Sequence, residues 1–293
     1  MLRTPTLPSL LLVCTLALGV LGCGSDGGSS SGNLEDALSL EDATWIIVDL
    51  DAGRVYGRDT PGDLSDDSLR SSKIAFKRIN GGSLTINADA SGPDGFTSTS
   101  LQPYELSGTV TVGPYYLAVF ELTQAQWQRL ASSSPWSILG SDVSNVSADA
   151  AAHNLSLASV QSVLANAALS NVSLRLPSKQ EWEYAARLSN NKHYAFGDNA
   201  GTTPPQADLI RPHAWTFETA AGDTGPFRVG AKQANGAGCF DMHGNVWEWT
   251  ADGKIRGGSW RDVVQQARSS NVNDLDADIP HPLVGVRPAL SLR

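Results

Sequence analysis

The last third of the chain constrains the fold most, because its apolar residues follow no helical repeat. From residue 190 to the C-terminus, Gly, Pro, Asn and Asp recur every few residues and interrupt every apolar run. This region of about a hundred residues is far longer than the usual connection between elements of secondary structure. We therefore expect turns, short strands and buried tryptophans to hold it together, with little regular secondary structure.

The composition agrees with a folded, loop-rich protein. Charged residues make up 17% of the chain, below the roughly 25% of typical globular proteins, whereas 41% of the residues are hydrophobic, which suffices for a sizeable core. The formal net charge is −9. Because positively charged contacts to phosphates supply most of the affinity for nucleic acid, the sequence disfavours a nucleic-acid partner.

The start of the chain resembles the export signal of a bacterial lipoprotein. Residues 1–22 begin with a positive charge and contain a short apolar stretch that is too short to span a membrane. A glycine then precedes Cys23, the residue that would carry the lipid; an ordinary signal peptide with an incidental cysteine is the alternative. The Gly/Ser-rich residues 23–33 predict a flexible tether.

This reading places the protein in the bacterial cell envelope, bound to a membrane through lipidated Cys23 and facing the periplasm or the exterior. Gly24, rather than an acidic residue, follows the cysteine and slightly favours the outer membrane over the inner one. The only cysteine outside the first 23 residues is Cys239, so we expect no intrachain disulfide in the mature protein.

Local patterns predict several elements in the remaining chain. Thr123 and Ser178 each stand three residues before a Gln or Glu and just ahead of a tryptophan, which is typical of capping boxes at helix starts. A third helix is predicted over 157–168. Strands are predicted over 45–50, 54–56 and 73–79, and a strand pair over 109–122. Residues 34–71 are interpreted as an N-terminal hairpin and loop extension, followed by the main domain.

Five segments, read in order, carry a resemblance to one family. They are FELTQAQW (120–127), LRLPSKQEWEYAAR (174–187), NGAGCFDMHGNVWEWTAD (235–252), IRGGSW (255–260) and VGVRPAL (284–290). Residues 72–293 resemble the formylglycine-generating-enzyme domain, also called the sulfatase-modifying-factor domain. The resemblance implies a compact α+β fold, distantly similar to C-type lectins, with a few capped helices and short antiparallel strands.

The sequence departs from the formylglycine-generating enzyme at its copper site. In that enzyme two cysteines, at two and seven residues after the Trp of RGGSW, bind copper and activate oxygen. Here these positions hold Asp262 and Ala267. Because thiolates are the soft ligands that Cu(I) prefers, copper and formylglycine-forming oxidation are not expected. An iron-dependent branch of the family uses a separate histidine-bearing helical domain, for which residues 34–71 have no room, so iron is not expected either.

The resemblance also implies a structural calcium ion. Carboxylates at both ends of a glycine-containing turn suit a hard cation. Asp241 and Glu248 would supply carboxylates, and Gly244 and Val246 would supply carbonyl oxygens. A metal-free, hydrogen-bonded turn is the alternative. A second calcium site of the family would fall near Asp208, Leu209 and Asp223.

Several functions stay open at this point. The favoured hypothesis is a lipid-anchored binding or structural protein whose protein or small-molecule ligand is unknown. The alternative is a cysteine-independent oxidoreductase or modifying enzyme that acts on a small molecule or peptide. In such an enzyme Asp262 would be the general base; otherwise Asp262 is a surface carboxylate without a catalytic role. Its candidate pocket residues are Ser259, Trp260, Asp262, Arg268 and Arg287.

A further alternative is a ligand-binding protein diversified by a retroelement, since some proteins of that kind share this fold. The variable face would then be the polar stretch 261–283. That stretch contains Asn271, Asn273, Asp274, Asp276, Asp278 and His281.

Overall fold

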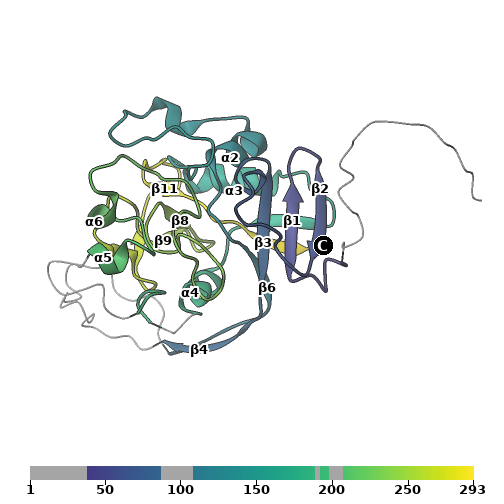
Figure 1. The fold of residues 1–293 in the computed structure, drawn as a ribbon. Coiled ribbons are helices and arrows are strands. Elements are labelled where there is room, and N and C mark those ends of the chain that lie inside the picture. Colours follow the sequence, from purple (N-terminus) through teal and green to yellow (C-terminus); the bar gives the residue numbers. More distant parts are fainter. Residues whose placement is uncertain (1–37, 87–107, 189–191, 198–206) are drawn as a thin grey trace, which may run out of the picture. The chain divides into compact units, whose positions relative to one another are not determined.

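A six-stranded antiparallel sheet organises the fold, with the strand order β2-β1-β3-β6-β12-β7 (Figure 1). The computed structural model describes residues 38–86, 108–188, 192–197 and 207–293, and everything below concerns these residues. The strands are β1 (Trp45–Asp49), β2 (Arg54–Arg58), β3 (Lys73–Ile79), β6 (Tyr115–Ala118), β7 (Val172–Arg175) and β12 (Ala289–Leu292). Segments from both ends of the described chain therefore meet in one sheet.

The N-terminal hairpin belongs to this same sheet. β1 pairs with β2 on one side and with β3 on the other, where Ile47 lies opposite Ala75. The predicted division between residues 71 and 72 is therefore a division in sequence resemblance and does not separate two sheets.

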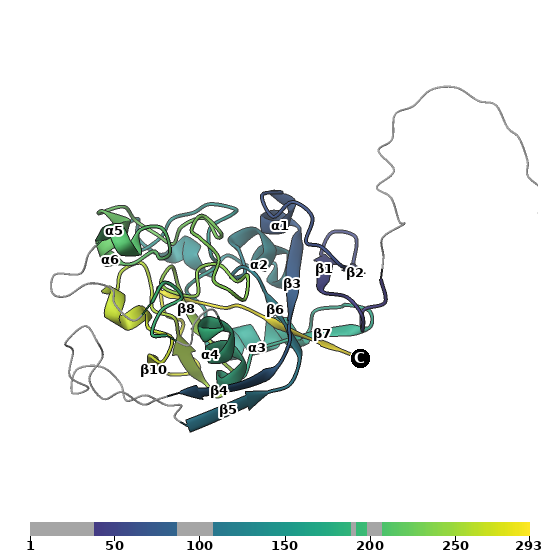
Figure 2. The ribbon, with the colours of Figure 1, turned by 60° about the horizontal axis from the view of Figure 1, so that its bottom comes forward.

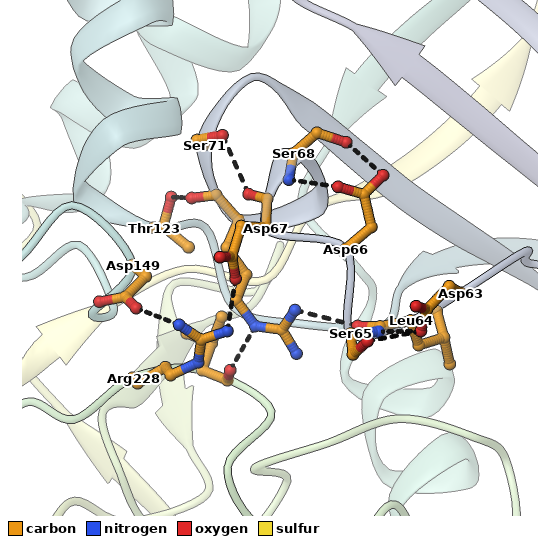
Figure 3. Close-up of polar contacts among 12 residues, drawn as sticks. Asp63, Leu64, Ser65, Asp66, Asp67, Ser68, Ser71, Thr123, Asp149 and Arg228 are labelled. Atoms are coloured by element: carbon orange, nitrogen blue, oxygen red, sulfur yellow. Dashed lines mark hydrogen bonds and ion pairs between the residues drawn. The ribbon is translucent and has the colours of Figure 1, made fainter. Parts of the chain in front are cut away.

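Polar contacts fix the loop after β2 to the main body (Figure 3). Arg228 bridges Asp67 and Asp149 at 2.6 and 2.5 Å. Arg70, in the one-turn helix α1 (Ser68–Ser71), donates to the carbonyl oxygens of Leu64 and Val229. The contacts of Arg228 and the bond from Arg70 to Val229 join residues far apart in the chain, so no local sequence pattern predicts them.

The remaining strands form two smaller sheets. One has the order β10-β9-β8-β11, with β10 (Val272–Asp274), β9 (Lys254–Arg256), β8 (Trp247–Trp249) and β11 (Val284–Gly285), the last parallel to β8. The other is the ribbon of β4 (Gly82–Ile86) and β5 (Gly108–Val112), which lies beside α4 (Lys179–Arg187) in Figure 2. The strand pair expected over 109–122 is present as β5 and β6, but its two strands enter different sheets.

Both predicted capping boxes are confirmed. Thr123 caps α2 (Gln124–Ala131) and Ser178 caps α4, and in each case the side chain three residues on returns a hydrogen bond to the cap. α3 (Leu157–Ala165) ends three residues earlier than predicted, with Asn166 as its C-cap. The remaining α5 (Ala207–Ile210), α6 (Phe217–Ala220) and the 3-10 turns η2 (Pro135–Ile138) and η3 (Val264–Ala267) are single turns, too short to leave a periodic pattern.

Buried tryptophans fill the aperiodic region, as expected. Trp182 and Trp249 are fully buried, and Trp247 and Trp260 nearly so. The indole N–H groups of Trp182, Trp247 and Trp249 donate hydrogen bonds to other segments; that of Trp249 donates to the carbonyl oxygen of Leu155 at 3.0 Å. The mixed α+β class and the low content of helix and strand are confirmed. Within the described ranges, no helix has the length and apolar character needed to cross a membrane.

Candidate functional site

The loop after β9 carries the residues that the sequence singles out. Gly257 and Gly258 both have positive φ angles, and a Cβ on Gly258 would lie 2.9 Å from the Cα of Ala267. The glycine pair therefore lets the loop fold back against η3. This close approach brings Ser259, Trp260 and Asp262 next to the turn that holds Ala267.

Asp262 is the centre of this loop. One of its carboxylate oxygens accepts a hydrogen bond from the Ser259 hydroxyl at 2.5 Å and another from the Trp247 indole at 2.8 Å. Ser259 is fully buried and Asp262 half-buried. The arrangement holds a carboxylate in a fixed orientation at the surface with two neutral donors. It suits proton acceptance or recognition of a hydrogen-bond donor.

The surroundings of Asp262 are partly apolar. The N–H of Phe217 donates to the Asp262 carbonyl oxygen at 2.8 Å, and the Glu218 carboxylate accepts from the N–H of Val264. Phe217 is 66% exposed and Val263 is 41% exposed. Burial lowers the pKa of nearby His281, and the Asp262 carboxylate opposes this effect. The loop thus presents one carboxylate beside two solvent-facing apolar side chains.

Trp260 lies under this surface. It is 6% exposed, its ring meets that of Phe227 edge-on, and its indole N–H makes no hydrogen bond with the described part of the chain. A buried donor without a partner is uncommon in folded proteins. Two hollows found among the described residues lie elsewhere, one beside β2 and one beside β7, and neither is lined by Asp262.

Ala267, the second position that corresponds to a family cysteine, is fully buried and structural. Its carbonyl oxygen accepts from Nδ1 of His243 at 2.7 Å, while Nε2 of His243 accepts from the N–H of Ala195 at 2.9 Å. These two contacts require the neutral ring with its proton on Nδ1. Burial lowers the pKa of His243 to about 4, which keeps the ring neutral.

The sequence predicts that Arg287 and Arg268 line a pocket with Asp262, but both arginines are buried. Arg287 is fully buried and forms a two-bonded ion pair with Glu248, with further donations to the carbonyl oxygens of Ala118 and Phe240. Arg268 is 3% exposed. A charge buried this deeply must be paired, so Arg287 holds the core together.

The proposed calcium residues form a hydrogen-bonded turn. The two carboxylate oxygens of Glu248 already accept from Arg287 and from the Trp182 indole. One oxygen of Asp241 accepts from the N–H of Gly230 at 2.6 Å, and burial raises the pKa of this carboxyl to about 6. The other oxygen of Asp241 is buried without a partner in the described residues.

As they lie, these residues do not fit a calcium ion, because Glu248 would have to leave Arg287. Calcium here stays a prediction. No cluster of three or more His, Cys, Asp or Glu side chains suited to a metal is found in the described ranges. At the second implied site, Asp208, Leu209 and Asp223 are all exposed.

Sequence reasoning missed Glu121. Its buried carboxylate accepts from the Asn245 amide at 2.5 Å and from the N–H of Val246 at 3.2 Å, so it ties this turn to the start of α2. Burial raises the pKa of Glu121 well above its ordinary value. The sequence signal for Glu121 is an acidic residue between the apolar Phe120 and Leu122, just ahead of the helix cap Thr123.

The polar stretch 261–283 is only partly a surface. Asp274, Asp276 and Asp278 are exposed, but Asn271 is 2% exposed and donates to the main chain and side chain of Gln266. The prediction that Asn271 belongs to a continuous recognition face is therefore wrong. Its side chain fixes the turn after η3.

Comparison with known proteins settles the family. The model of the sulfatase-modifying factor enzyme 1-like domain matches residues 70–292. The chain belongs to this family. Two solved structures share its fold. PvdO from Pseudomonas aeruginosa has a TM-score of 0.62 and 22% identity over 74% of this chain and 94% of that one. Treponema denticola variable protein 1 has a TM-score of 0.58 and 18% identity over 75% and 96%.

Curated relatives of this family member align over shorter stretches. The formylglycine-generating enzyme of Mycobacterium tuberculosis is 40% identical over 26% of either chain. The chaperone protein LppX of Paenibacillus barcinonensis is 33% identical over 39% of this chain and 48% of that protein. The inactive C-alpha-formylglycine-generating enzyme 2 of Mus musculus is 32% identical over 31% and 32%. The chain thus spans about a quarter to a half of these relatives.

Proposed function

We propose that this protein is a lipid-anchored binding protein of the bacterial cell envelope that uses the formylglycine-generating-enzyme fold without copper chemistry. The observation that carries the proposal is the pair of substituted positions. Asp262 is engaged by Ser259 and Trp247, and Ala267 is a buried methyl group. A carboxylate oxygen and a methyl group do not replace two soft thiolates.

The remaining thiol of the described chain supports the same view. Cys239 is fully buried in an apolar cluster, and burial raises the pKa of its thiol to about 11. The thiolate needed to bind Cu(I) is thus disfavoured at neutral pH. Cys239 acts here as a small core residue.

A binding role agrees with some of the related proteins. One relative carries the name of an inactive formylglycine-generating enzyme and another that of a chaperone protein. In this chain, the half-buried Asp262 offers an acceptor next to exposed Val263, and its main-chain carbonyl accepts from the N–H of exposed Phe217. We propose this surface as the ligand-binding surface, for a protein or a small molecule with a hydrogen-bond donor beside an apolar group.

Membrane attachment through Cys23 is the second part of the proposal, and this residue lies outside the described ranges. A wild-type chain expressed in a bacterial host should partition into the detergent phase, and Cys23→Ala should move it to the aqueous phase. Unchanged partitioning of Cys23→Ala would refute the lipid anchor.

The metal content of the full chain, purified without chelator, tests the absence of redox chemistry. We expect neither copper nor iron at a stoichiometric level. The same preparation tests calcium: bound calcium that is lost in Asp241→Asn would support the turn 241–248 as a site, whereas no calcium would favour the hydrogen-bonded turn. Near-stoichiometric copper or iron would overturn the proposal.

The hydrogen bonds that Asp262 accepts from Ser259 and Trp247 favour one enzymatic alternative. A carboxylate held by two neutral donors can accept a proton from a bound substrate. In a search for activity on peptides and small molecules, an enzyme of this kind should lose turnover in Asp262→Asn and retain more of it in Ser259→Ala. The hypothesis of a retroelement-diversified receptor stays a prediction, tested by whether the locus carries a reverse transcriptase and a near-copy of the coding segment.

A further inference from the structure

The hollow beside β2 lies between one face of the six-stranded sheet and the loop that follows this strand. Ile47 of β1 and Tyr56 of β2 are partners in the register, so their side chains share a face, and Arg58 lies two residues further along β2 on the same face. The loop contributes Asp63, and α1 contributes Leu69. The hollow measures about 100 Å³, and its buried part is apolar, because Ile47 and Leu69 line it and are both buried.

This hollow belongs mainly to the N-terminal extension. Among its lining residues, only Lys73 lies within residues 70–292, the part of the chain that the family model matches. The family motifs therefore imply no role for it, and its function has to be inferred from its own side chains.

Two cations line the hollow. The guanidinium carbon of Arg58 lies 5.1 Å from the centroid of the Tyr56 ring, and a Cβ on Gly62 would lie 3.4 Å from an Nη of Arg58. Lys73 lines the hollow from β3, and because β1 lies between β2 and β3, the two cations lie on either side of it. Within the described ranges, neither the Arg58 guanidinium nor the Lys73 ammonium forms a hydrogen bond or an ion pair. Both are thus available to an anionic group.

Two carboxylates line the hollow from the loop, and each is oriented by a serine (Figure 3). The N–H and the hydroxyl of Ser65 donate to one oxygen of Asp63 at 2.8 and 2.7 Å. The N–H and the hydroxyl of Ser68 donate to the two oxygens of Asp66 at 2.8 and 2.7 Å. These hydrogen bonds lower the pKa of both carboxyls, so both are charged at neutral pH. The second oxygen of Asp63 accepts no hydrogen bond from the described residues.

We propose that this hollow binds a free α-amino acid with a small side chain. Arg58 and Lys73 bind its carboxylate, and the open oxygen of Asp63 accepts from its ammonium group. Its side chain contacts Ile47 and Leu69. The lining offers charges of both signs, and a ligand fits two charges into about 100 Å³ only when few atoms separate them. Hydrogen bonds between charged groups are the strong ones, so both ends of the ligand contribute.

Other occupants match the hollow less well. A simple anion such as phosphate would meet Arg58 and Lys73 but would also lie beside the carboxylates of Asp63 and Asp66. A divalent cation would lie beside the two basic side chains. Such a cation takes six or more oxygen ligands, whereas three of the four carboxylate oxygens here already accept from serines. A drug-sized molecule needs a pocket of roughly 300 Å³ or more.

The first test uses the wild-type full chain and needs no variant. Isothermal titration calorimetry with glycine, L-alanine and L-serine, in a buffer without amines or carboxylates, should give saturable binding of at least one of them to a single site. Acetate and ethylammonium each keep one of the two charges. Each should bind at least roughly tenfold more weakly than the best amino acid, because half of the charged contacts are lost.

Variants then locate the site. Arg58→Gln should weaken binding by roughly tenfold or more. Arg54→Gln is the matched control, because Arg54 is also on β2, is exposed and does not line the hollow. Asp63→Asn keeps the oxygen that accepts from Ser65 but loses the charge, so it should also weaken binding. Asp59→Asn is its control, since Asp59 is an exposed residue of the same loop that lies outside the hollow.

Three results would overturn the proposal. They are no saturable binding of any of the three amino acids, binding by Arg58→Gln that equals that of Arg54→Gln, and binding of acetate or ethylammonium as tight as that of the best amino acid. The last result would indicate a site for a simple anion or a simple cation. None of these outcomes bears on ligand binding at the Asp262 loop, which shares no lining residue with this hollow.

Discussion

The Glu248–Arg287 pair and the Ser259–Asp262 pair place a carboxylate in opposite environments. Glu248 is 1% exposed, and its charge is met by a fully buried guanidinium and by the Trp182 indole. Asp262 is half-buried, and its carboxylate accepts from a hydroxyl and an indole, both neutral. The first carboxylate has its partners within the core. The second keeps contact with solvent.

This difference separates scaffold from site within one set of family motifs. The tryptophan-rich motif and the closing motif supply Glu248 and Arg287, which join β8 to the segment that leads into β12. The loop after RGGSW supplies Asp262 at the surface. Family membership therefore predicts how this chain folds more firmly than it predicts what the loop does.

Removal of Arg287 should give the largest loss of stability. Arg287→Met leaves Glu248 buried without its counter-charge, and we expect a loss of about 3–5 kcal/mol in the free energy of unfolding. Urea denaturation measures this loss. Arg228→Met is the matched control, because Arg228 forms exposed ion pairs and should cost below about 1 kcal/mol. Equal losses in the two variants would remove the distinction between the buried and the exposed pairs.

The neutral His243 beneath the Asp262 loop should make stability depend on pH. Its pKa of about 4 in the folded chain lies below the ordinary 6.5, because of burial. In the unfolded chain His243 therefore binds more protons between these values, so the contribution of this ring to stability is complete above about pH 6.5 and is lost as the pH drops toward 4, by roughly 2–3 kcal/mol.

His153, with a pKa also lowered to about 4 by burial, adds to the same loss. The His243→Asn variant retains a donor for the Ala267 carbonyl. Its free energy of unfolding should depend less on pH than that of the wild-type chain, whatever the value at neutral pH. Denaturation curves at pH 7 and pH 4.5 give the comparison. If His243→Asn lost as much stability as the wild-type chain between pH 7 and pH 4.5, the His243 ring would not control that loss.

Asp262→Ala should have only a small effect on stability, about 1 kcal/mol, since water can reach the Trp247 and Ser259 donors at a half-buried position. Asp262→Asn keeps an acceptor and should cost less. Thermal unfolding of both variants checks this order. A loss from Asp262→Ala as large as that from Arg287→Met would make Asp262 a structural residue and would remove the proposed site.

The sequence predicted local features well where a few neighbouring residues determine them. Thr123 and Ser178 cap their helices because the cap and its partner lie three residues apart. The burial of the tryptophans follows from a chain that lacks helices to fill its core. The fold itself came from the family motifs.

Contacts between distant segments escaped prediction. The ion pair of Arg287 joins residues 39 positions apart, and the contact of Glu121 with Asn245 joins residues 124 apart. No local pattern encodes which arginine faces which carboxylate, so Arg287 was placed at a pocket when it belongs to the core. The hollow beside β2 also depends on strand order, which the sequence does not state.

A Cu(I) titration of the full chain against a competing chelator shows whether the loop with Asp262 and Ala267 holds copper. The double variant Asp262→Cys/Ala267→Cys, which restores the thiols of the family, is the positive control for the method. We predict that the wild-type chain takes up no stoichiometric Cu(I) and consumes no oxygen in the presence of a cysteine-containing peptide. One tightly bound Cu(I) per wild-type chain, lost in Asp262→Ala, would contradict it.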